Sequence, residues 1–364
     1  MPSTASQLKL TVTEKIRALY VEKLYLTDAL VNAKKSFPLA HEGFVEVLIY
    51  QYYRCFETLL DEIDVSSVVI WNAFKYHHMI FAAMCRERGI KLLFAEFGAI
   101  PGTVVFDEDG QMGESWPATR PEEFNALSVS KTECAEAERI VTALRQSGSN
   151  RNVQQEGQTL EGLTSRLKPG RPILLFAGQC DRDSGMIPYN ETAKRFHSPS
   201  FASTLDAVIH VAEIAEANDW NLIFRPHPIA KQEAYDPRLP KNVIAFTEGS
   251  INDIIDLSDV VVTTLSSTVY VSLIRETPCV MLGYNQIHSK DCAYEALDKD
   301  SIEPVLQQAV TDGYTEAQKA AFVRHVAQMG KYYLFSDGLQ GAELSFGRSA
   351  EEITALVEYL LPKS

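Results

Sequence analysis

The sequence predicts an α/β protein with two domains, each built around a doubly wound parallel sheet and facing the other across a cleft. Three observations indicate this class. Short β-branched and apolar runs alternate with segments of helical periodicity in both halves of the chain, which is typical of βαβ units. The length of 364 residues favours two domains over one. A polar stretch at 146–170, containing SGSNRNVQQEGQ, separates the two series and suits a linker.

The first half opens with two helical patterns and continues into a βαβ unit. Apolar residues recur at helical spacing from Thr13 to Lys35, where Thr13 is a suitable cap, and again from Gly43 to Ile63. The βαβ unit that follows consists of a strand over 65–71 (VSSVVIW), a helix over 75–87 and a strand over 90–95 (IKLLFA). Further on, the Asp-Gly pair in DEDG at 107–110 predicts a hairpin turn.

The second half shows five strand patterns separated by helices. We expect the strands at 172–177, 220–225, 243–246, 259–263 and 278–282, and the helices at 201–218, 251–257 and 268–275. Ser203 and Asp206 have capping-box spacing at the start of the first of these helices. A last helix near 350–361 is expected to pack back on either domain. We therefore place the domains at 1–160 and 161–340, followed by a terminal segment at 341–364.

The composition excludes several classes of function. A net charge of −14 and a pI of about 5.1 argue against wholesale binding to nucleic acid or an anionic membrane, since both attract basic surfaces. The six cysteines form no CxxC or CxH spacing, so we predict neither a disulfide framework nor a metal site. No apolar run reaches the roughly 18 residues of a membrane span, and the start lacks a signal core. The sequence predicts a cytoplasmic protein, with peripheral association at the inner face of a membrane as an alternative.

Polar residues follow the predicted strands of the second half, where open α/β sheets bind ligands. Arg225-Pro226-His227-Pro228 follows WNLIF, and its prolines stiffen a turn from which Arg225 and His227 can donate to phosphate oxygens. Leu265-Ser266-Ser267-Thr268 follows DVVVT and opens a helix, where hydroxyls and N–H groups suit an anion. Taken singly, each segment is better explained as a rigid turn or an N-cap. Two such segments in one sheet favour a nucleotide mono- or diphosphate site.

Two further segments carry carboxylates at strand ends. The segment 178–185 (GQCDRDSG) follows PILLFA, and its Asp181 and Asp183 suit an active-site loop and an ordinary turn equally well. In the first half, Glu96 follows IKLLFA and is a candidate acid or base facing the cleft.

The order of these segments resembles the capsule polysaccharide biosynthesis family, which includes retaining β-Kdo transferases. The resemblance spans about Ile70 to Gly283 and rests on LIFRPHP, DLSDVVVTTLSST and PCVMLG, with AEFGAIPGTVVFDEDG and FAGQCDRDSGMIPY. It implies a GT-B-like fold of two Rossmann-like domains, with 1–160 on the acceptor side and 161–340 binding a nucleotide-sugar donor. It also implies a CMP-activated ulosonic acid, typically CMP-Kdo, as that donor.

The resemblance implies roles for individual residues. His227-Pro228 and Ser266-Ser267-Thr268 match the segments that engage the donor phosphate. Related sequences often place a Glu shortly after the second segment, where this chain has Val271 and Ser272; this departure puts a ribose contact from Glu276 in doubt. The matched and candidate donor-binding residues are Gly178, Gln179, Arg225, His227, Pro228, Glu248, Ser266, Ser267 and Thr268.

The catalytic candidates are Glu96, Asp181, Asp183 and His227. Glu96 and Gly98 match the family's Glu-x-Gly motif, and Asp181 and Asp183 match its acidic loop. Retention by double displacement needs a carboxylate nucleophile and a second acid/base group. We prefer Asp181 as the nucleophile because it is nearer the strand end, and Glu96 as the acid/base.

The sequence thus predicts a metal-independent glycosyltransferase that needs no cofactor besides its CMP-sugar substrate. Its partners are that donor and a glycan or glycolipid acceptor, not nucleic acid. A polyol-phosphate transferase using CDP-glycerol, a UDP-sugar glycosyltransferase and a non-catalytic nucleotide- or glycan-binding relative remain open.

Overall fold

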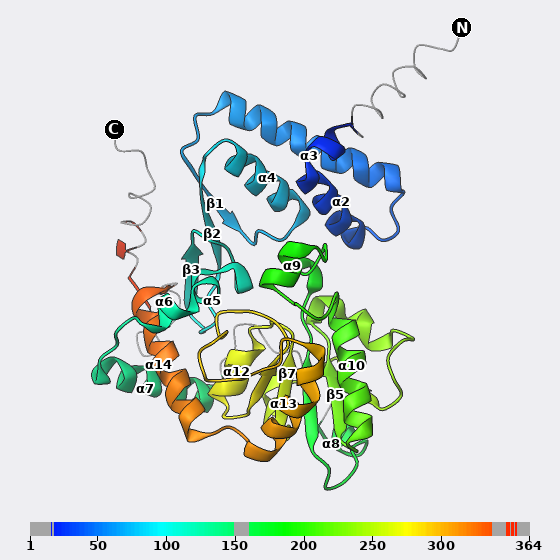
Figure 1. Ribbon diagram of the computed structural model, residues 1–364, viewed down its shortest axis with the longest axis vertical. Coiled ribbons are helices and arrows are strands. Elements are labelled where there is room, and N and C mark those ends of the chain that lie inside the picture. Colours follow the sequence, from blue (N-terminus) through cyan, green and yellow to red (C-terminus); the bar gives the residue numbers. More distant parts are fainter. Residues whose placement is uncertain are drawn as a thin grey trace.

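The structure is a computed structural model that describes residue 16 and residues 18–148, 160–336, 347–349, 351–352 and 354. It contains two sheets, each with its own helices. We call the part built on the first sheet the first unit and the part built on the second sheet the second unit. Figure 1 shows the first unit above the second, with helix α9 (Glu191–Phe196) between them.

The first sheet has four strands in the order β1-β2-β3-β10. Their bounds are Ser67–Trp71, Lys91–Phe97, Thr103–Asp107 and Leu334–Ser336. The β1–β2 pair is parallel because α4 (Tyr76–Glu87) carries the chain across, whereas the β2–β3 and β3–β10 pairs are antiparallel. The predicted parallel βαβ unit is confirmed for β1 and β2, and two antiparallel strands extend it.

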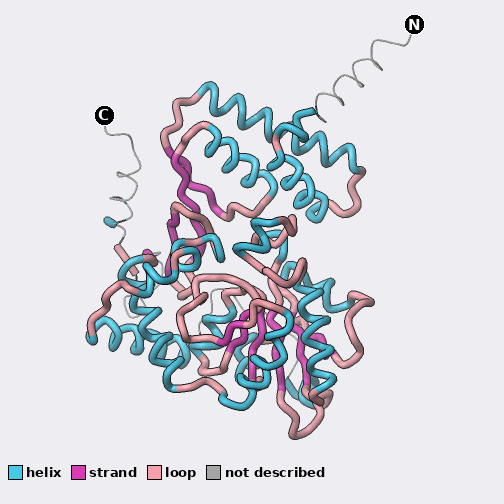
Figure 2. The backbone as a smooth tube through the Cα atoms, in the orientation of Figure 1, coloured by secondary structure: helices cyan, strands magenta, loops and turns pink. Residues whose placement is uncertain are grey.

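Three helices cover one face of this sheet. Helices α2 (Leu24–Ser36), α3 (Glu42–Glu62) and α4 bury apolar residues such as Leu26, Ile49, Ile80 and Phe94 in one cluster. The expected helix over 13–35 is interrupted, since Lys23 takes non-helical angles and precedes α2; its expected cap, Thr13, lies outside the described residues. The magenta strands and cyan helices of Figure 2 show this arrangement in the upper part of the molecule.

The second sheet has six strands in the order β6-β5-β4-β7-β8-β9, and every pair is parallel. The strands are β4 (Ile173–Ala177), β5 (Asn221–Arg225), β6 (Val243–Ala245), β7 (Val260–Thr263), β8 (Cys279–Met281) and β9 (Tyr294–Glu295). The chain builds one half outward from β4, returns to β7 beside it and builds the other half in the opposite direction. The predicted doubly wound parallel sheet is confirmed.

Helices bury both faces of the second sheet, which explains the continuous apolar runs of its strands. Leu174, Phe176 and Phe224 point to one face and join a core with α10 (Thr204–Ala217) and α13 (Lys299–Asp312). Leu175 and Ile223 point to the other face. There they meet α7 (Lys131–Ser147), α11 (Ile251–Leu257), α12 (Thr268–Ile274) and α14 (Glu316–Tyr332). The remaining short helices are α5 (Trp116–Thr119), α6 (Pro121–Asn125) and α8 (Leu160–Thr164).

The chain crosses between the units twice. Helix α7 packs on α12 and α14 of the second unit, although it falls within 1–160. Strand β10 falls within 161–340, yet it pairs with β3 of the first sheet. The two crossings lie side by side, because the Nζ of Lys331 and the hydroxyl of Tyr332 both donate to the carbonyl of Ser128. The predicted division into 1–160 and 161–340 at one linker therefore stays a proposal. The predicted terminal segment 341–364 lies largely outside the described residues.

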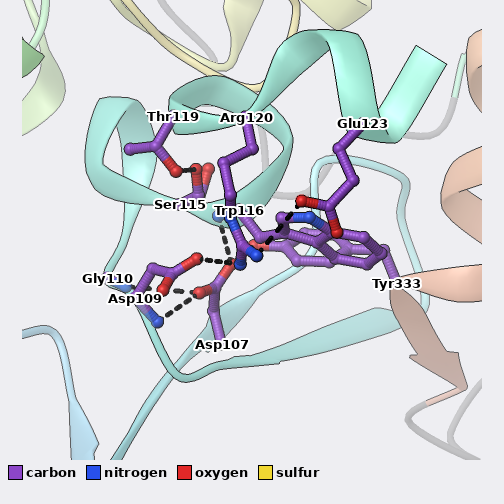
Figure 3. A network of polar contacts seen from close by, with 9 residues as sticks. All are labelled: Asp107, Asp109, Gly110, Ser115, Trp116, Thr119, Arg120, Glu123 and Tyr333. Atoms are coloured by element: carbon purple, nitrogen blue, oxygen red, sulfur yellow. Dashed lines mark hydrogen bonds and ion pairs between the residues drawn. The ribbon is translucent and has the colours of Figure 1, made fainter. Parts of the chain in front are cut away.

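The predicted hairpin turn at 107–110 is wrong, because Asp107 collects hydrogen bonds that end β3 instead. Its Oδ1 accepts from the backbone N–H groups of Asp109 and Gly110 at 2.8 and 3.2 Å. Its Oδ2 accepts from the Trp116 N–H at 2.8 Å and from the Tyr333 hydroxyl at 2.7 Å, as Figure 3 shows. Burial still raises the pKa of Asp107, which these hydrogen bonds oppose. The network ties the end of β3 to the second crossing.

Several general features accompany this fold. All six cysteines are free thiols. Within the described part of the chain, every helix is too short or too polar to span a bilayer. The described residues also contain no group of three or more His, Cys, Asp or Glu side chains placed to hold a metal ion.

Candidate functional site

The order of the second sheet fixes where a ligand site is expected. Strands β4 and β7 are neighbours, yet the chain leaves them in opposite directions across the sheet. At such a switch point the two connections part and leave a crevice beyond the carboxyl ends of the strands. The segments that follow β4 and β7 are those singled out from the sequence, 178–185 and 265–268. The topology therefore brings both to one edge of the sheet.

The segment after β4 connects the three strand ends. The N–H of Gly178 donates to the carbonyl of Arg225 at 2.8 Å, and a Cβ on Gly178 would meet that carbonyl at 3.2 Å. The buried side chain of Gln179 accepts from the N–H of Leu265 at 3.1 Å and donates to the Oγ of Ser184 at 3.4 Å. Gly178 and Gln179 thus hold the β4, β5 and β7 exits together, and the structure gives both a positioning role.

The segment after β5 has one buried and one half-buried candidate. Arg225 is only 8% exposed, and its guanidinium donates to the carbonyls of Phe246 and Gly249 at 3.3 and 2.9 Å. These two contacts fix the turn after β6, and phosphate binding by Arg225 stays a prediction. Glu248 lies in that turn, is exposed, and has the Nζ of Lys231 at 3.7 Å.

His227 lies at the edge of the sheet and caps the 3-10 helix η3 (Pro228–Tyr235), whose first residue is Pro228. Its Nδ1 accepts from the N–H of Ile229 at 3.2 Å. A neutral ring that accepts at Nδ1 carries its proton on Nε2. His227 is half-buried, so the two prolines and this hydrogen bond set the direction in which the ring can donate.

The segment after β7 places three hydroxyls at the start of α12. The Oγ of Ser266 accepts from the N–H of Thr268 at 3.2 Å and lies 3.0 Å from the Oγ1 of Thr268. The N–H of Ser266 donates to the Oγ1 of Thr263. Ser267 takes helical angles and makes no side-chain cap. Ser266 therefore caps the helix, as one interpretation of the sequence predicted, and the hydroxyls of Ser267 and Thr268 are half-buried.

The two aspartates of the β4 loop occupy different environments. Asp181 is 8% exposed, and its two oxygens accept from the N–H and the Oγ1 of Thr204 at 2.9 and 2.6 Å. Burial raises the pKa of Asp181 against these hydrogen bonds. Asp181 therefore anchors the start of α10. Asp183 is half-buried and its backbone carbonyl accepts from the Nδ2 of Asn72 in the first unit, at 3.2 Å.

Glu96 lies in the first sheet on the side that faces the second unit. It is half-buried and pairs with Val105 of β3. Its charge raises the pKa values of Tyr270 and Tyr333 further above those set by burial. Tyr270 is two residues beyond Thr268 on α12.

Residues of the first unit hold the β4 loop across the cleft. The buried amide of Asn32 donates to the carbonyls of Phe74, Arg182 and Ile187, each at 3.1 Å. Asn190 donates to the Oδ2 of Asp28 at 3.1 Å. We call these contacts the Asn32 clasp. They join helix α2 of the first unit to the loop that carries Asp183.

Two cavities border the loop held by this clasp. One of about 200 Å³ lies toward α4 and is lined by Asp28, Phe74, Arg86 and Asn190 among others. The other, of about 660 Å³, lies toward η3 and is lined by residues that include Lys35, Arg182, Glu233 and Arg238. Both mix charged and apolar walls, as sites for polar metabolites do.

Sequence reasoning missed Asn32 and Glu233 as parts of this site. Asn32 lies in a helix and Glu233 in η3, and neither follows a strand. A polar residue at a position where the helical period expects an apolar one is the signal that marks Asn32. Glu233 carries no comparable signal, because a glutamate after a proline turn is ordinary surface composition.

No protein-family model matches the chain, and no curated protein matches it. The structure is similar to Thermosulfurimonas dismutans KpsC, beta Kdo 2,7 transferase, with a TM-score of 0.50, 18% identity and coverage of 84% of this chain and 88% of that chain. The beta Kdo 2,4 transferase of the same KpsC matches with a TM-score of 0.48 and 15% identity, over 72% of this chain and 87% of that chain. The UDP-GlcNAc 2-epimerase of Methanocaldococcus jannaschii matches with a TM-score of 0.38 and 11% identity, over 79% of this chain and 81% of that chain. The first likeness shows a shared fold, and the GT-B-like arrangement of two Rossmann-like units is confirmed.

Proposed function

We propose that the protein is a glycosyltransferase that binds a nucleotide-sugar donor at the carboxyl edge of its second sheet. The observation that carries this proposal is the convergence of the β4, β5 and β7 exits at the β4–β7 switch point, beneath the first unit. Open α/β sheets bind nucleotides at such points. The fold shared with a structure named as a beta Kdo 2,7 transferase supports the same assignment.

The donor phosphate is assigned to His227 and to the hydroxyls after β7. The Nε2–H of His227 can donate to a phosphate oxygen, and Ser267 and Thr268 offer hydroxyls at the neighbouring strand end. A single phosphate needs few donors, which favours a CMP-sugar, and the resemblance of the sequence favours a CMP-activated ulosonic acid such as CMP-Kdo. Arg225 stabilises the turn after β6 by donating to the carbonyls of Phe246 and Gly249.

The acceptor is assigned to the first unit. The cavity toward α4 combines the carboxylate of Asp28 and the guanidinium of Arg86 with the ring of Phe74. Sugars bind such walls through hydroxyl contacts to charged groups and through apolar contact to rings. A glycan or glycolipid acceptor fits this chemistry, and peripheral contact with a membrane belongs to the same proposal.

For transfer with retention, Asp183 is the nucleophile that the geometry favours, with Glu96 as acid/base. In the first step the Asp183 carboxylate attacks the anomeric carbon while the bond to the phosphate oxygen breaks, and CMP leaves with the bonding electrons. In the second step an acceptor hydroxyl attacks that carbon, Glu96 takes its proton, and the bond to Asp183 breaks. Asp181 is set aside as nucleophile because both of its oxygens hold Thr204.

A donor screen tests the proposed function directly. CMP-Kdo, other CMP-sugars, CDP-glycerol and UDP-sugars are each incubated with the protein and a mixture of glycan acceptors, and products are read by mass spectrometry. Consumption of a CMP-sugar supports the proposal. Turnover of CDP-glycerol or UDP-sugars alone replaces the donor, and nucleotide binding without turnover of any donor identifies a non-catalytic relative.

Replacing His227 tests the phosphate contact. His227→Ala should raise the donor KM or lower kcat about ten- to a hundred-fold, since a hydrogen bond to a charged group contributes roughly 1.5–3 kcal/mol. His41→Ala is a matched control, because His41 also caps a helix through Nδ1, accepting from the N–H of Gly43 at 3.1 Å. Equal donor kinetics in the two variants would remove His227 from the site.

The hydroxyls after β7 are tested by a double substitution. Ser266→Ala with Ser267→Ala should weaken donor binding and also lower stability by about 1 kcal/mol, the usual contribution of an N-cap. Ser130→Ala, which removes the cap of α7, is the control for stability alone. If donor affinity is unchanged in the double variant, these hydroxyls only cap α12.

A further inference from the structure

A cavity apart from the β4–β7 crevice contains a buried cation, Lys290. It has a volume of about 320 Å³ and lies between α14, the end of α6 and the turn before β9. Its walls include Lys290, Arg324 and His325. This volume is at the lower end of the roughly 300–1,000 Å³ of small-molecule sites.

Lys290 is the unusual member of this cavity. It is 6% exposed, and its Nζ donates to the carbonyl of Pro117 at 2.9 Å and lies 5.2 Å from the ring centroid of Phe124. Among the described residues, no carboxylate oxygen lies within 4.0 Å of this ammonium. Buried charges are ordinarily paired, because removal from water without a partner is costly.

The other charged groups at the cavity leave its interior positive. Arg324 is exposed at the mouth of the cavity, and its guanidinium donates a hydrogen bond to the carbonyl of Asn125 at 3.0 Å. Burial lowers the pKa of His325 well below its usual value, so its ring is neutral. Asp291 is exposed at the rim. Burial lowers the pKa of Lys290 to about 8, and the charges of Glu295 and Asp291 oppose this shift. The ammonium of Lys290 and the guanidinium of Arg324 therefore line the cavity, and the carboxylate on its wall, that of Asp291, is exposed at the rim.

We propose that this cavity binds a small oxyanion, with Lys290 as the buried counter-ion and Arg324 closing its mouth. Phosphate and carboxylate groups share the required chemistry, a compact negative charge with several acceptor oxygens. Free phosphate and a carboxylate-bearing metabolite are the two sources. The site is independent of the donor crevice, since its residues come from other strand exits and from α14.

The cavity also has a connection to the donor site. The Nε2 of His325 lies 2.9 Å from the hydroxyl of Tyr270, and Tyr270 belongs to α12, which starts at the crevice. An anion on the cavity side of α14 therefore contacts a wall that is hydrogen-bonded to α12.

The test is binding of inorganic phosphate and of acetate, each against chloride at matched ionic strength, read by thermal shift and by calorimetry on the full chain. Wild-type protein should be stabilised by one or both anions. Arg324→Gln, an exposed substitution, should bind about ten-fold or more weakly, as loss of a charge-assisted hydrogen bond implies. Lys290→Met should abolish the response without lowering the melting temperature in chloride, because it removes an unpaired buried charge.

Two controls separate this cavity from other phosphate contacts. Arg139→Gln removes an exposed arginine on α7 that pairs with Glu136, and it should leave the response unchanged. His227→Ala should keep the part of the response that Lys290→Met removes, because the donor crevice is a different site. Wild-type binding that persists in both Lys290→Met and Arg324→Gln, or a wild-type protein that responds to neither anion, would overturn the proposal.

Discussion

Replacing Glu233 by glutamine should make the protein more stable at alkaline pH. Glu233 lies in η3 and lines the 660 Å³ cavity together with Asp181 and Asp236. Its Oε2 is buried, and no hydrogen-bond partner for it is found among the residues that the structure describes. Burial, and then the charges of Asp181 and Asp236, raise the pKa of Glu233 from 4.5 to about 8. The carboxyl therefore keeps its proton at neutral pH.

The sign and size of the effect follow from this pKa. Between pH 4.5 and about 8 the native protein holds a proton on Glu233 that the unfolded chain has lost. The contribution of Glu233 to the free energy of unfolding is complete below the unfolded pKa and is lost as the pH rises through the folded pKa. At about 1.36 kcal/mol per pH unit, the difference 8 − 4.5 corresponds to at most about 5 kcal/mol. Lys35, Arg182 and Arg238 line the same cavity and reduce this amount.

The assay is equilibrium urea denaturation of wild type and Glu233→Gln at about pH 5 and about pH 8.5. The first lies near the lower limit of the window in which the protonation of the two states differs, and the second lies above its upper limit. We expect the two proteins to agree within about 1 kcal/mol at the lower pH, and the variant to be more stable by about 2–5 kcal/mol at the higher. Glu138→Gln, on the exposed face of α7, should show no such pH dependence. An equal difference at both pH values, or a variant less stable at pH 8.5, would refute the reasoning.

Three further substitutions test other parts of the structure. Asp107→Asn leaves an N–H without an acceptor and should lower the free energy of unfolding by about 1–3 kcal/mol. Asp109→Asn loses only an exposed ion pair and should lower it by less than about 1 kcal/mol. Denaturation curves that give the two variants equal stability would contradict this. Asp181→Asn should lower the melting temperature while donor turnover persists, and abolished turnover with unchanged stability would restore Asp181 as nucleophile. Gly113→Ala should destabilise by about 1–3 kcal/mol or more, because its Cβ would lie 1.5 Å from the carbonyl oxygen of Phe196; a wild-type melting temperature would count against it.

The sequence predicted five of the six strands of the second sheet because these strands are buried on both faces. Continuous apolar runs such as PILLFA and DVVVT appear as β4 and β7 within one or two residues. Helix α11 has the predicted bounds, and Ser203 caps α10 by accepting from the N–H of Asp206. Local signals suffice where each element carries its own period and cap.

The first sheet was predicted less completely because two of its strands depend on distant partners. β3 follows the loop after β2, but β10 comes from the far end of the described chain and is only three residues long. The DEDG segment was misread for the same reason, since Asp107 bonds to Tyr333, which is 226 residues away in the sequence. No local pattern reports such a contact.

Among the site residues, position along the chain was predictable and the direction of the side chain was not. The strand-end rule brought 178–185, 225–228 and 265–268 to one edge. It did not reveal that Arg225 turns inward to two carbonyls or that Asp181 holds Thr204. Both assignments depend on atoms of neighbouring turns, which no strand pattern specifies.

The paired crossings between the units have a mechanical consequence. A body joined to another at one point can swing in any direction, whereas two adjacent attachments permit mainly one rotation. The passage that ends at Ser128 and the passage at Tyr333 are bonded to each other through Ser128 and Lys331. We expect a relative motion of the two units to turn about this pair of passages and to break the Asn32 clasp first.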